Sequence, residues 1–202
     1  QSGALILDTR ANGDFAKGFI PQSINIGING DFAPWVGAMI VDVNQPIILV
    51  TNAGMEEETV TRLSRVGFDH VLGHLKGGFQ SWVDADKEMD TVHRITATEF
   101  ASQIEGKDVM VIDVRKESEY AAEHVEDAYS KPLAYINDWV NDIDPKQPFY
   151  LHCAGGYRSM IAASILQARG YRNFIEIEGG FKAIAETQIP KTDFVCQSKV
   201  LK

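Results

Sequence analysis

One cysteine in this chain stands where an activated thiol would be built. Cys153 opens the run Cys-Ala-Gly-Gly-Tyr-Arg, between a short apolar segment and a stretch with helical periodicity. Gly155 and Gly156 allow a tight curl in which several backbone N–H groups converge on one point. A thiolate at Cys153 would gain from these groups, from the start of the next helix and from the charge of Arg158. The pattern predicts a nucleophile, because a structural cysteine requires neither the glycines nor the arginine.

The segments around this loop predict the elements that must hold it. Residues 149–151 read as a short buried strand, and the apolar residues from Met160 to Leu166 recur at helical spacing until Gly170. In the second half we expect strands at 109–113, 149–153 and 173–177, and helices at 116–122, 133–142, 158–169 and 179–186. This alternation predicts an α/β fold with a parallel sheet and helices on both faces. Cys153 then lies at the carboxyl end of a strand, where such sheets carry their sites.

The chain contains the same unit twice. The matching segments are 5–10 with 110–115 (110 − 5 = 105), 46–51 with 148–153 (148 − 46 = 102), and 77–79 with 179–181 (179 − 77 = 102). A polar, charged stretch from Asp84 to Arg94 separates the copies. We therefore predict two α/β domains, at residues 1–90 and 91–202.

The two copies differ at their beginnings. The second copy has an extra element from about residue 95 to 104, which opens with Thr96 and Glu99 at the spacing of a capping box. The first copy has only seven residues before Asp8, and the chain does not begin with methionine. We expect that the chain is part of a longer polypeptide or lacks its N-terminal part. A natural loss of that helix is the alternative.

Composition excludes several classes of partner. The net charge of the 202 residues is −9 and there is no basic run, which argues against nucleic acid and against an anionic membrane surface. No apolar stretch approaches membrane-spanning length, and the start lacks a signal-peptide pattern. The two cysteines, Cys153 and Cys196, stand in different contexts, so a disulfide framework is not expected. A reducing cytoplasm is the predicted location.

Together these motifs resemble the rhodanese family of sulfurtransferases, in a tandem arrangement that covers nearly the whole chain. The motifs are Asp113-Val114-Arg115, the run from Cys153 to Ser159, and Glu178-Gly179-Gly180-Phe181 in the second copy, with Asp8-Thr9-Arg10 and the run from Gly77 to Trp82 in the first. The resemblance implies a parallel sheet wrapped by helices in each copy. It therefore agrees with the fold expected from the periodicity.

The resemblance also implies a chemistry. Cys153 would attack the outer sulfur of a sulfane donor and become a persulfide, and a thiol or cyanide acceptor would remove that sulfur. Arg158 would supply positive charge beside the anionic persulfide and orient the donor, and a structural role in capping or pairing at the first turn of the helix is compatible with this. The loop residues expected to bind the sulfur through their backbone are Ala154, Gly155, Gly156, Tyr157 and Ser159. No cofactor and no metal is implied, and the partners are small molecules.

The donor is left open among thiosulfate, a glutathione-type persulfide and polysulfide. The loop carries no lysine or second arginine, which favours persulfide or polysulfide over doubly charged thiosulfate. Four residues separate Cys153 from Arg158 (158 − 153 − 1 = 4). The corresponding loop of cysteine-dependent phosphatases is longer, so phosphatase activity is not favoured.

The first copy departs from this pattern. Thr51 stands at the cysteine position, and a threonine without an adjacent base is a far weaker nucleophile than a thiolate. Glu56 stands at the arginine position, where its charge suits the helix dipole and could fill the vacant anion site. The first copy is therefore predicted to be catalytically inactive, with a structural role.

Three other sites have structural interpretations. Asp113 and Arg115 are expected to close a strand-to-helix turn, because the first copy retains both residue types. His152 should point to the opposite face of the strand from Cys153, which makes it a poor general base. Cys196 is expected to be a buried or spare thiol, since no glycine loop or arginine accompanies it. A resolving role, in which it takes sulfur from Cys153, is the alternative if the tail folds back over the loop.

Two further hypotheses stay open. Tandem rhodanese copies of this kind occur after metallo-β-lactamase-fold hydrolases related to persulfide dioxygenases, so the resemblance allows an N-terminal metallo-hydrolase domain that would bring its own metal. Alternatively, the chain is a binding or regulatory module in which neither copy turns over. The intact loop at Cys153 argues against this last hypothesis for the second copy.

Overall fold

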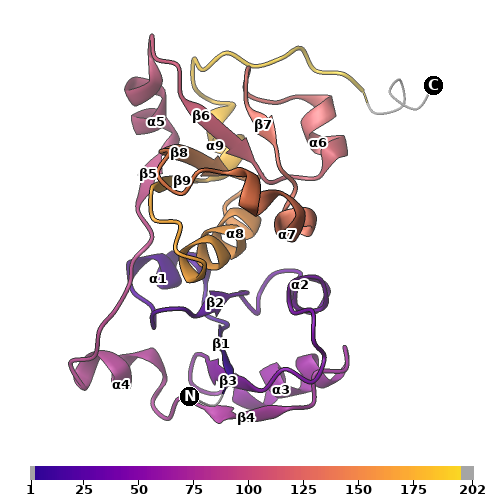
Figure 1. Cartoon of the computed structure of the whole chain (residues 1–202), viewed down its shortest axis with the longest axis vertical. Coiled ribbons are helices and arrows are strands. Elements are labelled where there is room, and N and C mark those ends of the chain that lie inside the picture. Colours follow the sequence, from indigo (N-terminus) through magenta and orange to yellow (C-terminus); the bar gives the residue numbers. More distant parts are fainter. Residues whose placement is uncertain (1–2, 197–202) are drawn as a thin grey trace. The chain divides into compact units, whose positions relative to one another are not determined.

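The computed structural model of the chain describes residues 3–196 and contains two α/β units (Figure 1). The chain passes from the first unit to the second between Val92 and His93. Each unit has its own parallel sheet. No helix in the described part of the chain combines the length and apolarity needed to cross a membrane.

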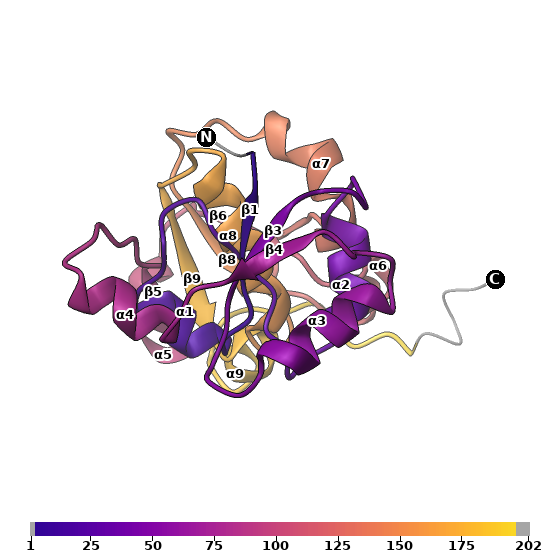
Figure 2. The ribbon, with the colours of Figure 1, turned by 90° about the horizontal axis from the view of Figure 1, so that it is seen from below.

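The sheet of the first unit has four strands in the order β2-β1-β3-β4, and all its neighbours are parallel. Its strands are β1 (Leu5–Asp8), β2 (Ile24–Asn25), β3 (Ile47–Val50) and β4 (Val71–His74), and its helices are α1 (Asn12–Lys17), α2 (Phe32–Met39), α3 (Glu56–Ser64) and α4 (Gly78–Asp84). Figure 2 shows α1 and α4 on one side of these strands and α2 and α3 on the other.

The sheet of the second unit has five parallel strands in the order β5-β9-β8-β6-β7. The strands are β5 (Arg94–Thr96), β6 (Met110–Asp113), β7 (Tyr129–Ser130), β8 (Phe149–His152) and β9 (Phe174–Glu178), and the α-helices are α5 (Ala97–Ile104), α6 (Glu117–Ala122), α7 (Ile136–Trp139), α8 (Tyr157–Ala168) and α9 (Gly180–Ile184). The prediction of two parallel-sheet α/β domains is confirmed.

One helix prediction in this unit was partly wrong. The segment 133–142 is α-helical only over Ile136–Trp139, with 3-10 helices at Leu133–Tyr135 and Val140–Asp142 on either side. Asparagine and aspartate are frequent here, and their side chains compete for backbone hydrogen bonds. A continuous helix is therefore not formed.

The two sheets repeat each other in register, apart from a shift in the β3–β4 pairing between Ile47 and Ile48. Leu49 pairs with His74 in the first unit, and Leu151 pairs with Glu176 in the second. The sequence repeat is therefore also a structural repeat, and each residue of one site has a counterpart in the other. In the described part of the first unit, β5 and α5 have no counterpart, so β4 forms the sheet edge there whereas β5 covers β9.

The extra helix α5 begins as its sequence predicts. Thr96 is the N-cap, and its hydroxyl accepts a hydrogen bond from the backbone N–H of Glu99. The carboxylate of Glu99 accepts one in return from the backbone N–H of Thr96, which completes the capping box. Burial of Phe100 then holds the helix against its unit.

An aspartate–arginine turn recurs after the first core strand of each unit. The two side chains form a buried salt bridge of 2.6 Å, and the guanidinium lies 4.0 Å from the centroid of a phenylalanine ring. The groups are Asp8–Arg10 with Phe79 and Asp113–Arg115 with Phe181. Because both units contain the same contacts, they support the structural role expected for this pair.

Candidate active site

Cys153 lies directly after β8, between that strand and the first turn of α8. The strand runs between β9 and β6 in the sheet, so the loop is at the carboxyl edge of a central strand. Only 1% of Cys153 is exposed. The structure therefore places the candidate nucleophile where parallel α/β sheets build their sites, with its side chain covered.

The loop curls at one of its two glycines. Gly156 has a φ of +98°, and its backbone N–H donates a hydrogen bond to Sγ of Cys153 at 3.1 Å. Gly155 does not have a positive φ, and a Cβ added to it would meet no atom within 4 Å. The first copy has Ala53 and Gly54 at these positions, and Gly54 has a φ of +84°. Only the second glycine is therefore required by the backbone.

The first residues of α9 hold the loop from the other side. Gly180 has a φ of +56°, and a Cβ on it would lie 2.4 Å from the carbonyl oxygen of Cys153. This close approach lets the N–H of Phe181 donate to the carbonyl of Cys153 at 2.6 Å, and the N–H of Lys182 donate to the carbonyl of Ala154 at 3.1 Å. The two bonds fix the loop carbonyls toward α9.

Arg158 is paired rather than free. Its guanidinium donates two hydrogen bonds to the carboxylate of Glu119 in α6, at 2.5 and 2.8 Å. These bonds hold the pKa of Glu119 below its usual value, and they raise the pKa of Arg158. The sequence predicted that Arg158 orients a donor, with capping or pairing at the first turn of its helix as a compatible structural role. The structure shows a fork-to-fork ion pair, so Glu119 compensates much of this charge, and the role of Arg158 toward a donor stays a prediction.

The hydroxyl of Ser159 links the cysteine to a buried carboxylate. Ser159 Oγ lies 3.4 Å from Cys153 Sγ and 2.6 Å from Oε1 of Glu176. The other carboxylate oxygen of Glu176 accepts a hydrogen bond of 2.6 Å from Nε of Arg94 in β5. Burial raises the pKa of Glu176, although Arg94 and Ser159 oppose that shift. The sequence predicted only a backbone role for Ser159.

Three residues of this site were missed at the level of sequence: Glu119, Glu176 and Arg94. Glu176 carried a signal, because an acid at an interior position of an otherwise apolar strand is unusual. Glu119 lies 39 residues from Arg158, and Arg94 lies 82 residues from Glu176. No local spacing identifies such pairs.

Tyr157 and Ala154 are half-buried, and Gly155 is exposed at the tip of the loop. Tyr157 is the first residue of α8. These residues belong to the same loop as the cysteine, as predicted. Their roles in binding a donor stay predictions.

His152 faces away from the sulfur. It is fully buried, and its ring stacks on Phe181 of α9 with centroids 6.2 Å apart, whereas Cys153 contacts α8. Its Nε2 lies 4.0 Å from Asp113 and has no hydrogen-bond partner. Burial lowers the pKa of His152, so the ring is neutral at neutral pH. The prediction that it points to the opposite face of the strand is confirmed.

The counterpart site in the first unit carries different groups. Thr51 is 4% exposed, and its hydroxyl has no hydrogen-bond partner. Glu56 begins α3 where Arg158 stands in the second copy. A pocket of about 460 Å³ lies over this region, lined by Thr51, Arg10, Lys17 and Phe79 among others. The unit keeps the fold of the site but has neither the thiol nor the arginine.

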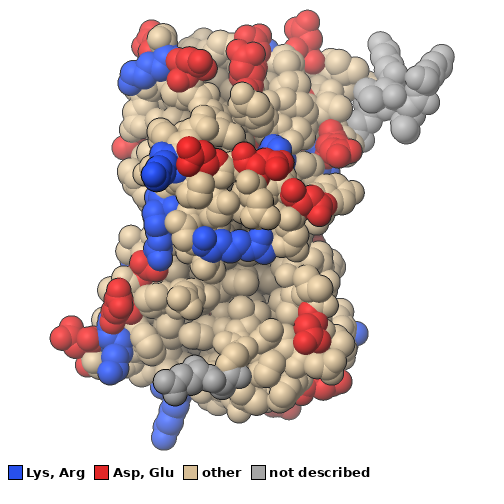
Figure 3. Space-filling model, viewed as in Figure 1, with Lys and Arg blue, Asp and Glu red and all other residues tan. Residues whose placement is uncertain are grey.

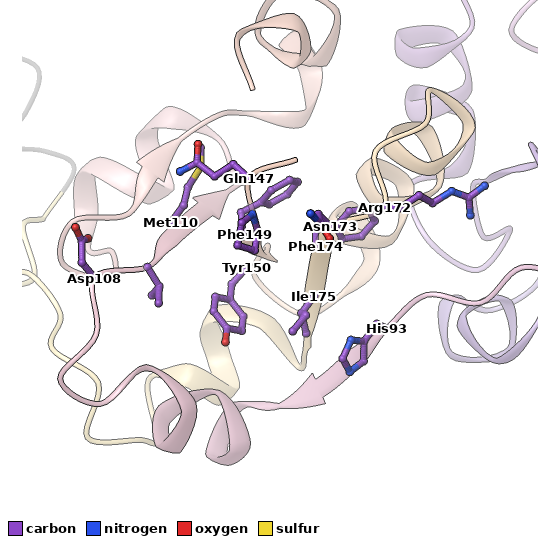
Figure 4. A pocket seen from close by; sticks show the side chains of 12 residues that line it. His93, Asp108, Met110, Gln147, Phe149, Tyr150, Arg172, Asn173, Phe174 and Ile175 are labelled. Atoms are coloured by element: carbon purple, nitrogen blue, oxygen red, sulfur yellow. The ribbon is translucent and has the colours of Figure 1, made fainter. Parts of the chain in front are cut away.

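A second pocket lies at the amino ends of β6, β8 and β9, opposite the edge that carries Cys153 (Figure 4). It measures about 440 Å³ and includes Met110, Phe149, Tyr150 and Phe174. None of its lining residues is a cysteine. We therefore assign it no part in the chemistry of the cysteine.

The described part of the chain also bears on metal binding and on the second cysteine. Among residues 3–196, no group of three or more histidine, cysteine, aspartate or glutamate side chains could hold a metal ion. Cys196 is exposed, so it is not a buried thiol, and its role stays a prediction. On the face drawn in Figure 3, acidic side chains are spread over both units, in line with the net charge of −9.

Comparison with known proteins places these observations in a family. The profile of the rhodanese-like domain matches residues 1–85 and again residues 96–187. An uncharacterized protein of Synechocystis is 33% identical over 82 residues, which are 41% of this chain and 46% of that protein. The thiosulfate sulfurtransferase GlpE of Coxiella burnetii is 25% identical over 79 residues, 39% of this chain and 74% of that one.

One solved structure is similar to about half of the chain. The rhodanese-like domain protein of Staphylococcus aureus is 30% identical and has a TM-score of 0.45, over 49% of this chain and 97% of that one. The chain thus matches less than half the length of the Synechocystis protein, and it matches the Staphylococcus domain with about half of its own length.

Proposed function

The chain belongs to the rhodanese-like domain family, and from this premise we propose that its second copy is a sulfurtransferase acting through a persulfide of Cys153. The sulfane donor would be a persulfide, polysulfide or thiosulfate, and the acceptor a thiol or cyanide. The observation that carries the proposal is the convergence of the Gly156 N–H and the Ser159 hydroxyl on Sγ of Cys153. A structural cysteine requires neither contact.

The proposed reaction has two displacement steps. The thiolate of Cys153 attacks the outer sulfur of the donor, a new S–S bond forms, and the donor remainder leaves with its bonding electrons as a thiolate or as sulfite. The acceptor then attacks that outer sulfur, and Cys153 leaves as a thiolate. The two steps balance without an added oxidant or reductant, and no metal or cofactor takes part.

The charges around the loop favour a singly charged donor. Glu119 compensates the charge of Arg158, and a doubly anionic donor therefore finds little uncompensated positive charge here. This supports persulfides and polysulfides over thiosulfate. The name of the Coxiella relative keeps thiosulfate within the range of donors to be tested.

We propose that the first copy is not catalytic. Thr51 provides no thiolate, and Glu56 places a carboxylate where the second copy has an arginine. The first copy would then have a structural role.

Turnover with cyanide as acceptor tests this function. Thiosulfate and glutathione persulfide are supplied separately, and thiocyanate is measured for the wild type and for Cys153→Ser. Thr51→Val is the matched control, because it changes the equivalent position of the first copy. We expect thiocyanate from the wild type and from Thr51→Val, and none above background from Cys153→Ser. Equal rates in all three proteins would contradict the proposal.

A binding or regulatory module is the second candidate. The observation that favours it is the 1% exposure of Cys153, since a covered thiol is reached only by a small or slender donor. A folded wild type that neither turns over nor acquires sulfur would support this candidate. An N-terminal metallo-hydrolase partner and a cytoplasmic location stay predictions of the sequence, because the comparisons concern the rhodanese-like copies alone.

A further inference from the structure

The hydroxyl of Ser159 has two partners and one hydrogen. Its oxygen lies 3.4 Å from Sγ of Cys153 and 2.6 Å from Oε1 of Glu176. A serine hydroxyl donates once and accepts through its lone pairs, so one of the two partners must supply the second hydrogen. All three side chains are buried, with exposed fractions of 1% for Cys153 and 0% for Ser159 and Glu176. Water is therefore a poor substitute for either partner.

This arrangement couples the proton of the thiol to the proton of the carboxyl group. When Glu176 is ionised, Ser159 donates to it, and the thiol of Cys153 donates to Ser159. When Cys153 is a thiolate, Ser159 donates to the sulfur, and a protonated Glu176 donates to Ser159. The two hydrogen-bonding patterns differ by the transfer of two protons along one line of contacts. In each pattern, all three side chains have a hydrogen-bond partner.

We propose that Ser159 and Glu176 form a relay that removes the thiol proton of Cys153. Ser159 accepts the S–H proton while it passes its own O–H proton to Oε1 of Glu176. The products are a thiolate, a restored hydroxyl and a neutral carboxylic acid, and the net charge of the three groups is unchanged. Glu176 acts through Ser159 and positions the proton. The inference rests on the proposed function, because the relay supplies the thiolate that attacks the donor.

The surroundings of Glu176 suit a proton acceptor. Burial raises its pKa toward that of a thiol, and the exposed neighbour Glu178 acts in the same direction. Arg94 opposes this shift and holds the other oxygen, so Oε1 stays directed at Ser159. On the side of the sulfur, Arg158 interacts electrostatically with Cys153 and with Asp113, and it is paired with Glu119.

The first copy provides an internal comparison. Glu57 stands at the position of Ser159 (159 − 102 = 57), and His74 stands at the position of Glu176 (176 − 102 = 74). The β-sheet registers agree with this correspondence. His74 is exposed. The serine–carboxylate pair therefore occurs only in the copy that carries the thiol.

The pH dependence of Cys153 alkylation tests the relay. Iodoacetamide is applied to the full chain, and labelling of the Cys153 peptide is followed by mass spectrometry, with the exposed Cys196 as an internal standard. In the wild type, Cys153 should be labelled at a rate that does not change with pH near neutrality, because the proton moves within the site. Glu176→Gln should abolish this pH independence and slow labelling near neutral pH by about 10²-fold, the lower end of the contribution of a positioned acid–base group.

The control is Glu178→Gln, which removes the neighbouring acid that also pairs with Arg94, at 3.4 Å, but is not hydrogen-bonded to Ser159. It should keep the pH-independent labelling of the wild type and change the labelling rate far less than Glu176→Gln, because Glu178 acts on Glu176 only through its charge. Ser159→Ala should slow labelling in the same direction as Glu176→Gln, and it tests the relay should Glu176→Gln fail to fold. Thermal unfolding reports the folding of each variant.

Two outcomes would overturn the relay. If Glu176 acts only as a fixed negative charge, Glu176→Gln will speed alkylation, because removal of that charge favours the thiolate. An unchanged profile in Glu176→Gln and Ser159→Ala, or a wild-type Cys153 that is unreactive at every pH, would equally contradict it. The assay contains no sulfane donor, so its result is independent of whether Cys153 transfers sulfur.

Discussion

The sulfur of Cys153 is held by groups that come from its own loop and from the following helix. Gly156 donates its backbone N–H to the sulfur at 3.1 Å, and Ser159 brings its hydroxyl to 3.4 Å. Both contacts favour an anionic sulfur, whether thiolate or persulfide, because each can donate a hydrogen bond to it. Residue by residue, the site is arranged around a negative charge.

Substitution by alanine should be destabilising at Gly156 and nearly neutral at Gly155. Gly156→Ala forces a side chain into a φ of +98°, which should lower the free energy of unfolding by about 1–3 kcal/mol and slow labelling of Cys153. Gly155→Ala should change the free energy of unfolding by no more than about 0.5 kcal/mol, since its Cβ meets no neighbour. Chemical denaturation of the two variants checks this. Equal losses would show that the backbone of the loop differs from that described.

The Glu119–Arg158 pair predicts a pH-dependent contribution to stability. The folded state holds the pKa of Glu119 below the ordinary glutamate value of 4.5, so the folded state binds fewer protons than the unfolded state in acid. The contribution is thus present above that value and is lost as the pH falls through the lower, folded pKa. Because the pair is partly exposed, we expect about 0.5–1 kcal/mol.

Glu119→Gln measures this contribution. Its free energy of unfolding should lie below that of the wild type at neutral pH, and the difference should shrink as the pH falls below 4.5. Denaturant melts at several pH values provide the comparison. A difference that stays constant with pH would mean that Glu119 stabilises the fold without its charge.

At the scale of elements, α5 and β5 distinguish the second unit from the described part of the first. β5 pairs with β9 and brings Arg94 to Glu176, so an extra edge strand completes the surroundings of the buried carboxylate. In the first unit β4 is the edge strand, and its His74 is exposed at the equivalent position. The extra elements therefore contribute to the site as well as to the core.

The capping box at the start of α5 predicts a measurable stability loss. Thr96→Ala removes the hydroxyl that accepts from the N–H of Glu99, and should lower the free energy of unfolding by about 1 kcal/mol. Thr98→Ala is the matched control, because Thr98 is exposed within the same first turn and is not the cap. Thermal or denaturant unfolding separates the two. A loss as large in Thr98→Ala would contradict the capping role.

The sequence was informative wherever local spacing decides structure. The β8 strand, the loop after it and the α8 helix follow from a period change around Cys153, and the Thr96 cap follows from a four-residue pattern. The partner of Arg158 could not be foreseen, because Glu119 lies on another helix 39 residues away. Contacts of this kind depend on how elements pack, which no local pattern encodes.

At the scale of the whole molecule, the same fold occurs twice with different side chains at the equivalent sites. Both units keep the aspartate–arginine turn and the positive-φ glycines of their loops. Only the second has the thiol of Cys153, the Arg158–Glu119 pair and the contact between Ser159 and Glu176. Retention of the fold without these groups indicates that the architecture alone does not make the site reactive.

This difference predicts that a thiol alone will not activate the first copy. In a Cys153→Ser background, Thr51→Cys should restore less than a hundredth of wild-type thiocyanate formation, since acid–base assistance of about 10²-fold or more is missing. The same assay with Thr51→Ser serves as the control for substitution at that position. Recovery of near wild-type turnover would show that the loop fold is sufficient.

The central claim is that Cys153 carries the transferred sulfur, and peptide-resolved mass spectrometry tests it most directly. The protein is exposed briefly to thiosulfate or to glutathione persulfide, digested, and analysed for added sulfur on the peptides of Cys153 and Cys196. The account predicts one added sulfur on the Cys153 peptide, removed by cyanide or a thiol and absent in Cys153→Ser. No adduct, or equal labelling of Cys196, would contradict it.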